Sequence, residues 1–232
     1  MKVGLGWSQT RDGWTAGHEI AQAAMEHGAI TRPSLALAFC STPVDAEALL
    51  AGIRSSIGPN TPVVGGSGVG IITHEAICYA GSVSGLLLIE APETQIHLAT
   101  ATGLDAGEAQ VGRELARQLP PDPSTLTLLF YDSVRVGPTP QSPPIMNSSR
   151  ALLRGLEDQL GRRCPIFGAG VVGDLGLSPT IQLLGDRVAT QSAAAISLRD
   201  GFDLDWCIMH GCTLKDGLYY RITKCDGAVI HE

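Results

Sequence analysis

The chain contains an internal repeat, which constrains its fold more than any other feature. Residues 49–70 (LLAGIRSSIGPNTPVVGGSGVG) align without gaps on residues 152–173 (LLRGLEDQLGRRCPIFGAGVVG), a shift of 103 positions. The identical pairs are Leu49/Leu152, Leu50/Leu153, Gly52/Gly155, Gly58/Gly161, Pro62/Pro165, Gly65/Gly168, Val69/Val172 and Gly70/Gly173. Such a repeat indicates that one supersecondary unit was used twice, so equivalent segments are expected to meet across a pseudo-twofold axis.

The repeat extends toward the N-terminus of each copy. Residues 34–39 (SLALAF) align on residues 125–130 (TLTLLF), but at a shift of 91. The second copy therefore holds extra residues between these blocks, in residues 131–149. This excursion is rich in proline: Pro138, Pro140, Pro143 and Pro144.

The hydrophobic pattern predicts the same element order in both copies, β-α-β-α-β-turn-β-β. In the first copy, a helix is expected from Thr42 as N-cap, and a β-hairpin around Ala80-Gly81. The second copy has its hairpin signal at Gly185-Asp186. We predict an α/β protein made of two pseudo-symmetric repeats, residues 1–92 and 93–200, that form mixed sheets covered by helices.

Residues 201–232 are expected to add C-terminal strands. A strand is predicted over residues 203–210, and Asp226-Gly227 is a strong hairpin signal near the end of the chain.

Composition excludes several classes of protein. The chain has 232 residues, 44% of them hydrophobic, which suffices for a sizeable core. Its 16 basic residues are scattered and outnumbered by 23 acidic ones, so a nucleic-acid partner is not expected. Neither a long apolar run nor a signal-peptide pattern is present, so we expect no membrane partner and a cytoplasmic location.

The cysteines predict free thiols. There are six, without a CxxC spacing, and most lie in apolar strand-like runs. Buried thiols in a reducing compartment are favoured over disulfides or a metal site, and we expect neither metal nor cofactor.

The order of these motifs resembles the N-terminal half of the FIST family, predicted sensory domains of signal-transduction proteins. The resemblance rests on GWSQTRD, LALAFCSTPVDAEALLAGI, PVVGGSGVGII, PIFGAGVVGD, and HGC followed by ITKCDGAVIHE. It implies a small-molecule ligand such as an amino acid, and a downstream signalling partner. It also implies that residues 201–232 lead toward a C-terminal FIST domain, so we expect a shortened or naturally short form. It carries over no catalytic residue.

The two glycine-rich segments form the predicted ligand site. Glycines at a strand end let the backbone approach a ligand and present N–H groups to a carboxylate, although they can also be simple strand exits. In open α/β sheets, ligands collect outside such strand ends. The candidate ligand-binding residues are Gly65, Gly66, Ser67, Gly68, Gly168, Ala169, Gly170, Asp174, Cys40, Ser41 and His210.

Nucleotide-binding motifs are excluded. Gly168, Gly170 and Gly173 spell GxGxxG, but Asp174 opposes phosphate and Pro179 breaks the helix that a dinucleotide site needs. There is also no GxxxxGK[ST] sequence, so a P-loop is excluded.

Three functions stay open on the sequence alone. The first is a non-enzymatic sensory domain that binds a small polar molecule. The second is a hydrolase-like enzyme that uses Cys212 and His210, or Ser67, as its nucleophilic group. The third is a protein-interaction scaffold that docks a partner through residues 138–144.

Overall fold

The computed structural model describes residues 1–122, 125–160, 164–207, 211, 217, 220–226 and 229–232. The chain divides into a main body, Met1–Gly201, and a C-terminal segment, Phe202–Glu232. In the C-terminal segment, β15 (Cys225–Asp226) pairs antiparallel with β16 (Val229–Ile230). The strand predicted over residues 203–210 is not formed at residues 203–207, and its remainder lies outside the described residues.

The main body contains both repeats. The first consists of β1 (Lys2–Ser8), α1 (Gly13–His27), β2 (Leu35–Cys40), α2 (Ala46–Ile57), β3 (Val63–Ser67), β4 (Ile71–Ile72), β5 (Ile77–Cys78) and β6 (Ser84–Glu90). The second consists of β7 (Gln95–Thr102), α3 (Glu108–Gln118), β8 (Leu126–Asp132), β9 (Val134–Val136), β10 (Ile145–Met146), α4 (Ser149–Leu160), β11 (Ile166–Val171), β12 (Gln182–Leu184), β13 (Arg187–Ala189) and β14 (Ser192–Arg199).

The two repeats have the same strand order. The first sheet runs β1-β6-β2-β3 and then continues with β12-β13, and the second runs β7-β14-β8-β11. In both, the second and third strands of the repeat are parallel (β2 with β3, β8 with β11) and the last strand, β6 or β14, is antiparallel to its neighbours. The predicted α/β class with mixed sheets and two similar repeats is therefore confirmed. Because β12 and β13 belong to the second repeat, they tie it to the first sheet.

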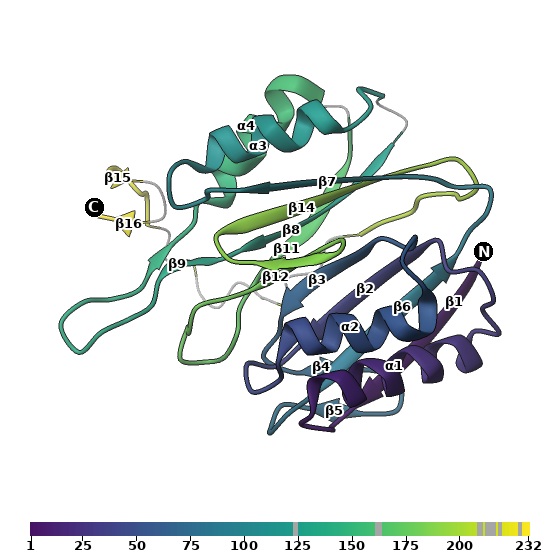
Figure 1. Ribbon diagram of the computed structural model, residues 1–232. Coiled ribbons are helices and arrows are strands. Elements are labelled where there is room, and N and C mark those ends of the chain that lie inside the picture. Colours follow the sequence, from purple (N-terminus) through teal and green to yellow (C-terminus); the bar gives the residue numbers. More distant parts are fainter. Residues whose placement is uncertain (123–124, 161–163, 208–210, 212–216, 218–219, 227–228) are drawn as a thin grey trace. The chain divides into compact units, whose positions relative to one another are not determined.

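The main body buries three clusters of apolar side chains. One lies between α1, α2 and the first sheet, and another between α3, α4 and the second sheet. The third, which includes Leu35, Val64, Leu184 and Ile196, lies between the two sheets. The helices therefore cover the outer faces of two stacked sheets (Figure 1). None of the helices in the described ranges is long and apolar enough to cross a membrane.

The helices of each repeat cross at glycines. Gly17 of α1 lies against the backbone carbonyl of Leu49 in α2, and Gly52 of α2 lies against that of Trp14 in α1. The second repeat has the same contacts: Gly112 against Leu152 and Gly155 against Ala109. A Cβ atom at any of these glycines would overlap the facing carbonyl oxygen. This close approach explains why Gly52/Gly155 is an identical pair of the repeat.

Two local predictions for the first repeat are wrong. Helix α2 begins at Ala46 rather than next to Thr42, because the carboxylate of Asp45 accepts hydrogen bonds from Glu47 N and Ala48 N and caps it. No hairpin forms around Ala80-Gly81: β4 pairs with β5, while β6 pairs with β1 and β2. The expected hairpin around Gly185-Asp186 does form, as β12–β13.

The close helix crossing predicts the direction in which Gly52→Ala changes the free energy of unfolding. In an exposed helix Gly→Ala would stabilise by about 1 kcal/mol through helix propensity. We expect Gly52→Ala instead to lower the free energy of unfolding by about 2 kcal/mol, because the new methyl group meets the backbone of α1. Urea unfolding followed by circular dichroism measures the change.

The matched control is Ala51→Gly, at an exposed position of the same helix. It should cost about 1 kcal/mol from propensity alone. A Gly52→Ala variant that is more stable than the wild type would show that the helices are not held at this distance.

Candidate functional site

The glycine segments are strands rather than turns, which corrects the prediction. Gly65, Gly66 and Ser67 lie inside β3, and residues 168–170 lie inside β11. Gly65 has a φ of +138°, a backbone conformation that side chains disfavour, and a Cβ there would overlap the carbonyl oxygen of Ala38. At the equivalent Gly168, a Cβ would overlap the carbonyl oxygen of Leu129. Both glycines are therefore explained by strand packing.

The polar groups around Ser67 are engaged in the fold. Ser67 is 5% exposed, and its Oγ accepts a hydrogen bond from Ile181 N at 3.0 Å. Gly68 N donates to the carbonyl of Cys40 at 2.8 Å, so Gly68 closes the end of β3 onto β2. Burial raises the pKa of the Cys40 thiol to about 12, which keeps it protonated. Neither Ser67 nor Cys40 has the surroundings of an activated nucleophile.

Ser41 fastens the end of β2. Its hydroxyl accepts from Val83 N at 2.9 Å and donates to the carbonyl of Gly81 at 3.1 Å. Beyond it, Thr42 Oγ1 donates to the carbonyl of Gly173 at 2.8 Å, which brings the segment after β11 next to the end of β2.

Asp174, the next residue, stabilises its own turn. Its Oδ1 accepts from Ser178 N at 3.0 Å, and hydrogen bonds from the Ser178 side chain and backbone lower the pKa of its carboxyl group. Of the predicted residues, the structure gathers Cys40, Ser41, Gly65, Gly66, Ser67 and Gly68 at the ends of β2 and β3. His210 lies outside the described residues, as does Cys212.

The two glycine segments line separate pockets. Gly68 and Gly70 line one of about 260 Å³, with apolar side chains of β1, β2, β4 and β6 around them. Gly168, Ala169 and Gly170 line another of about 300 Å³ between β11, β8 and the start of α4. Each is at the lower end of the size of small-molecule sites, about 300 Å³.

A buried carboxyl group lies between the sheets and was missed in the sequence analysis. Asp132, the last residue of β8, is 0% exposed. Its Oδ1 accepts from Gln182 Nε2 at 3.2 Å and its Oδ2 from Ser192 N at 3.1 Å. Burial raises its pKa to about 6, against an ordinary value of 3.8. Gln182 Oε1 has no hydrogen-bond partner among the described residues.

The repeat could have revealed Asp132. At a shift of 91, it is the counterpart of Ser41. Ser41 Oγ accepts from Val83 N in the first repeat just as Asp132 Oδ2 accepts from Ser192 N in the second. Asp132 is therefore a strand-closing residue that also reaches Gln182 of the other sheet.

Metal and disulfide chemistry find no support in the described part of the chain. Its free cysteines are Cys40, Cys78, Cys164, Cys207 and Cys225. In the same residues, no group of three or more His, Cys, Asp or Glu side chains could hold a metal ion.

The fold and its strand-end polar groups define a duplicated α/β domain. The chain belongs to the FIST N domain family, whose family model matches residues 34–232. Members of this family are sensory domains of signal-transduction proteins. The resemblance stated from the sequence is thereby confirmed.

Solved structures of low similarity complete the comparison. The chain is similar to cyanuric acid hydrolase from A. caulinodans, with 11% sequence identity and a TM-score of 0.37, over 85% of this chain and 72% of that one. It is also similar to a second cyanuric acid hydrolase structure, with 9% identity and a TM-score of 0.41, over 84% and 68% of the two chains. No curated protein matches the chain.

The raised pKa of Asp132 gives a pH-dependent prediction. Between about pH 4 and pH 6 the folded state keeps a proton on Asp132 that the unfolded state has lost. This group's contribution to the free energy of unfolding is therefore largest at low pH and falls as pH rises through about 6, by up to about 3 kcal/mol.

Asp132→Asn isolates this contribution. The amide can accept from Ser192 N and, with the Gln182 amide rotated, donate to Gln182 Oε1. We expect the stability of the wild type relative to Asp132→Asn to fall between about pH 4 and about pH 7, measured by urea unfolding. A difference that does not change with pH would contradict the raised pKa.

Proposed function

We propose that this domain is a cytoplasmic, non-enzymatic sensory module that binds a small molecule such as an amino acid. The observation that carries the proposal is the pocket of about 260 Å³ beside Gly68 and Gly70. Ligand sites are mostly apolar hollows with a few polar groups, and this pocket has that character. Membership of the FIST N domain family supports a role in sensing.

The walls of the pocket favour an apolar ligand body. They include Leu5, Leu37, Phe39 and Leu87, which lie on adjacent strands of the first sheet. These side chains are only partly buried, although Leu37 also packs against the cluster between the sheets and the Phe39 ring lies edge-on to that of Phe130 in β8. Hairpin β4–β5 contributes Ile71 and Ile72 as the opposite wall. An amino acid with an apolar side chain fits such walls.

One polar side chain of the pocket could orient a ligand carboxylate. Thr73 Oγ1 accepts hydrogen bonds from Glu75 N at 3.1 Å and Ala76 N at 3.0 Å. Within the described residues, these bonds leave the hydroxyl hydrogen as a donor toward a ligand. Thr73 is therefore the proposed contact for the polar end.

The enzymatic alternative has weaker support. The Ser67 hydroxyl is buried and accepts a hydrogen bond from Ile181 N, and Cys212 and His210 lie outside the described residues. The interaction alternative rests on the exposed arm that carries β9 and β10, in which Thr139 and Ser142 form an isolated bridge.

The test is ligand-induced thermal stabilisation with a panel of the common amino acids. We expect at least one with an apolar side chain to raise the Tm, on the order of 5 °C at a hundredfold excess over Kd. Leu5→Trp should abolish this shift, because the indole fills the pocket.

Val3→Trp is the matched control. Val3 lies on the same face of β1 as Leu5, is 48% exposed, and does not line the pocket. Its response should equal that of the wild type. The proposed site would be refuted by a Leu5→Trp variant that still responds, and the proposed ligand class by a panel without any shift.

A further inference from the structure

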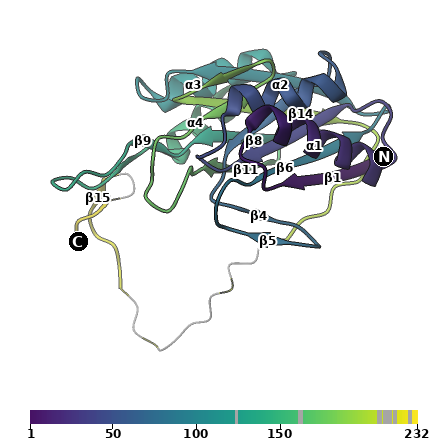
Figure 2. The ribbon, with the colours of Figure 1, turned by 60° about the horizontal axis from the view of Figure 1, so that its bottom comes forward.

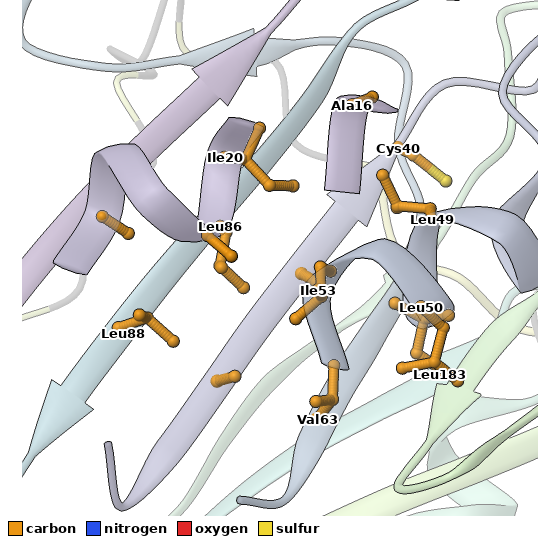
Figure 3. Packing of buried hydrophobic residues seen from close by; sticks show 14 of the residues in the cluster. Ala16, Ile20, Cys40, Leu49, Leu50, Ile53, Val63, Leu86, Leu88 and Leu183 are labelled. Carbon is orange, nitrogen blue, oxygen red and sulfur yellow. The ribbon is translucent and has the colours of Figure 1, made fainter. Parts of the chain in front are cut away.

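The outer edge of β3 shows how this fold closes a sheet. There, Ser67 N donates to the carbonyl of Ile181 at 2.9 Å, and Gly185 N donates to that of Val63 at 2.8 Å. Leu183 of β12 lies opposite Gly65 and is 0% exposed. Figure 3 shows it next to Leu50, on the side of the sheet that α2 covers. An apolar side chain from the other repeat thus fills the space between strand and helix.

The equivalent edge of the second sheet is open. β11 is the last strand of its sheet, and no strand among the described residues pairs with its outer side. At the shift of 103, Ile166, Gly168 and Gly170 correspond to Val63, Gly65 and Ser67. Thr127 N of β8 donates to the carbonyl of Pro165, and Ser133 N donates to that of Val171. The backbone N–H and C=O groups of the odd-numbered residues of β11 therefore point toward β8. The backbone groups of Ile166, Gly168 and Gly170 therefore point outward, as those that bind β12 do in the first sheet.

The space beside this open edge is a pocket, which we call the socket. Its volume is about 300 Å³, and it is lined by Leu129, Tyr131, Ser149 and Leu153 besides β11. By the repeat, these residues are the counterparts of Ala38, Cys40, Ala46 and Leu50, which share a buried cluster with Leu183. The socket is therefore the place that a counterpart of Leu183 would fill.

The hairpin at the matching place in the first repeat extends no sheet in the described chain, although its Ile71 and Ile72 also line the pocket beside Gly68 and Gly70. β4 and β5 pair only with each other within the described chain, whereas β12 and β13 extend a sheet. Figure 2 shows this hairpin projecting from the strands of the first sheet. Ile72 is 67% exposed and Ile77, its cross-strand neighbour, 70%. Exposed strands with apolar side chains are templates for pairing with another chain.

We propose that β11 binds hairpin β4–β5 of a second copy of this chain. In this arrangement β4 pairs with the outer edge of β11, and Ile72 enters the socket as Leu183 enters its counterpart. In this arrangement each copy donates its hairpin β4–β5 and accepts another at the edge of β11. Two copies can therefore exchange hairpins and form a closed dimer, and three or more copies can form a closed ring. The contact is small, so the association is reversible and depends on concentration.

Sedimentation of the full chain, without added ligand, tests the proposal. As the protein concentration is raised a hundredfold, the average mass of the wild type should rise above that of one chain. Ile72→Asp should raise the dissociation constant about tenfold or more, because a carboxylate would enter an apolar socket. Ile145→Asp is the matched control: Ile145 is a similarly exposed isoleucine, 52% exposed, on β10.

A second variant tests the acceptor side. Ser149 and the neighbouring Arg150 are both exposed, but only Ser149 lines the socket. Ser149→Trp should block association and Arg150→Trp should not, with circular dichroism confirming that all variants fold. A wild type that keeps the mass of one chain overturns the proposal. So does association that Ile72→Asp leaves unchanged, because the edge would then bind a different segment.

Discussion

The pairing of β12 with β3 holds the two repeats of the main body together. β12 has three residues, and because successive side chains alternate between faces, Leu183 points to one face of the first sheet while Gln182 and Leu184 point to the other. Leu183 fills the helix side of the first sheet, Leu184 packs between the sheets, and Gln182 reaches the buried carboxyl group of Asp132 in the second sheet. A shift of this strand by one residue would exchange these environments and place a glutamine in an apolar cluster. The environments of these three side chains therefore fix the register in which β12 pairs with β3.

Much of this fold could be predicted because its signals are local. The alternation of apolar and other side chains predicted β2 at residues 35–40. The repeat at a shift of 103 predicted α4 and β11 as the counterparts of α2 and β3. Turn chemistry at Gly185-Asp186 correctly indicated β12–β13. The family resemblance, read from short motifs in order, was confirmed over residues 34–232. Each of these signals depends on residues that are close in sequence, or on a comparison of the chain with itself.

The errors arose where distant atoms decide the structure. Gly65 and Gly168 looked like turn residues, but they are needed because the carbonyl oxygens of Ala38 and Leu129 occupy the place of a side chain. The sequence around Ala80-Gly81 is suitable for a hairpin, yet β6 pairs instead with β1 and β2 and lies between them. Asp132 resembled an ordinary polar residue at a strand end, because its contact with Gln182 arises only when β12 joins the first sheet. At the candidate site, the ends of β2 and β3 lie side by side, but the two glycine segments line different pockets.

The late position of β12 in the sequence has a consequence for synthesis of the chain. When the first repeat has left the ribosome, β3 still lacks its neighbour, since residues 182–184 are translated more than a hundred residues after it. Contacts between such distant segments form slowly, because a long loop must close first. During that interval the nascent chain exposes both the unpaired edge of β3 and the apolar space that Leu183 later fills. Nascent chains on neighbouring ribosomes could pair through this edge, so the rate of translation across the second repeat sets how long the chain is at risk of aggregation.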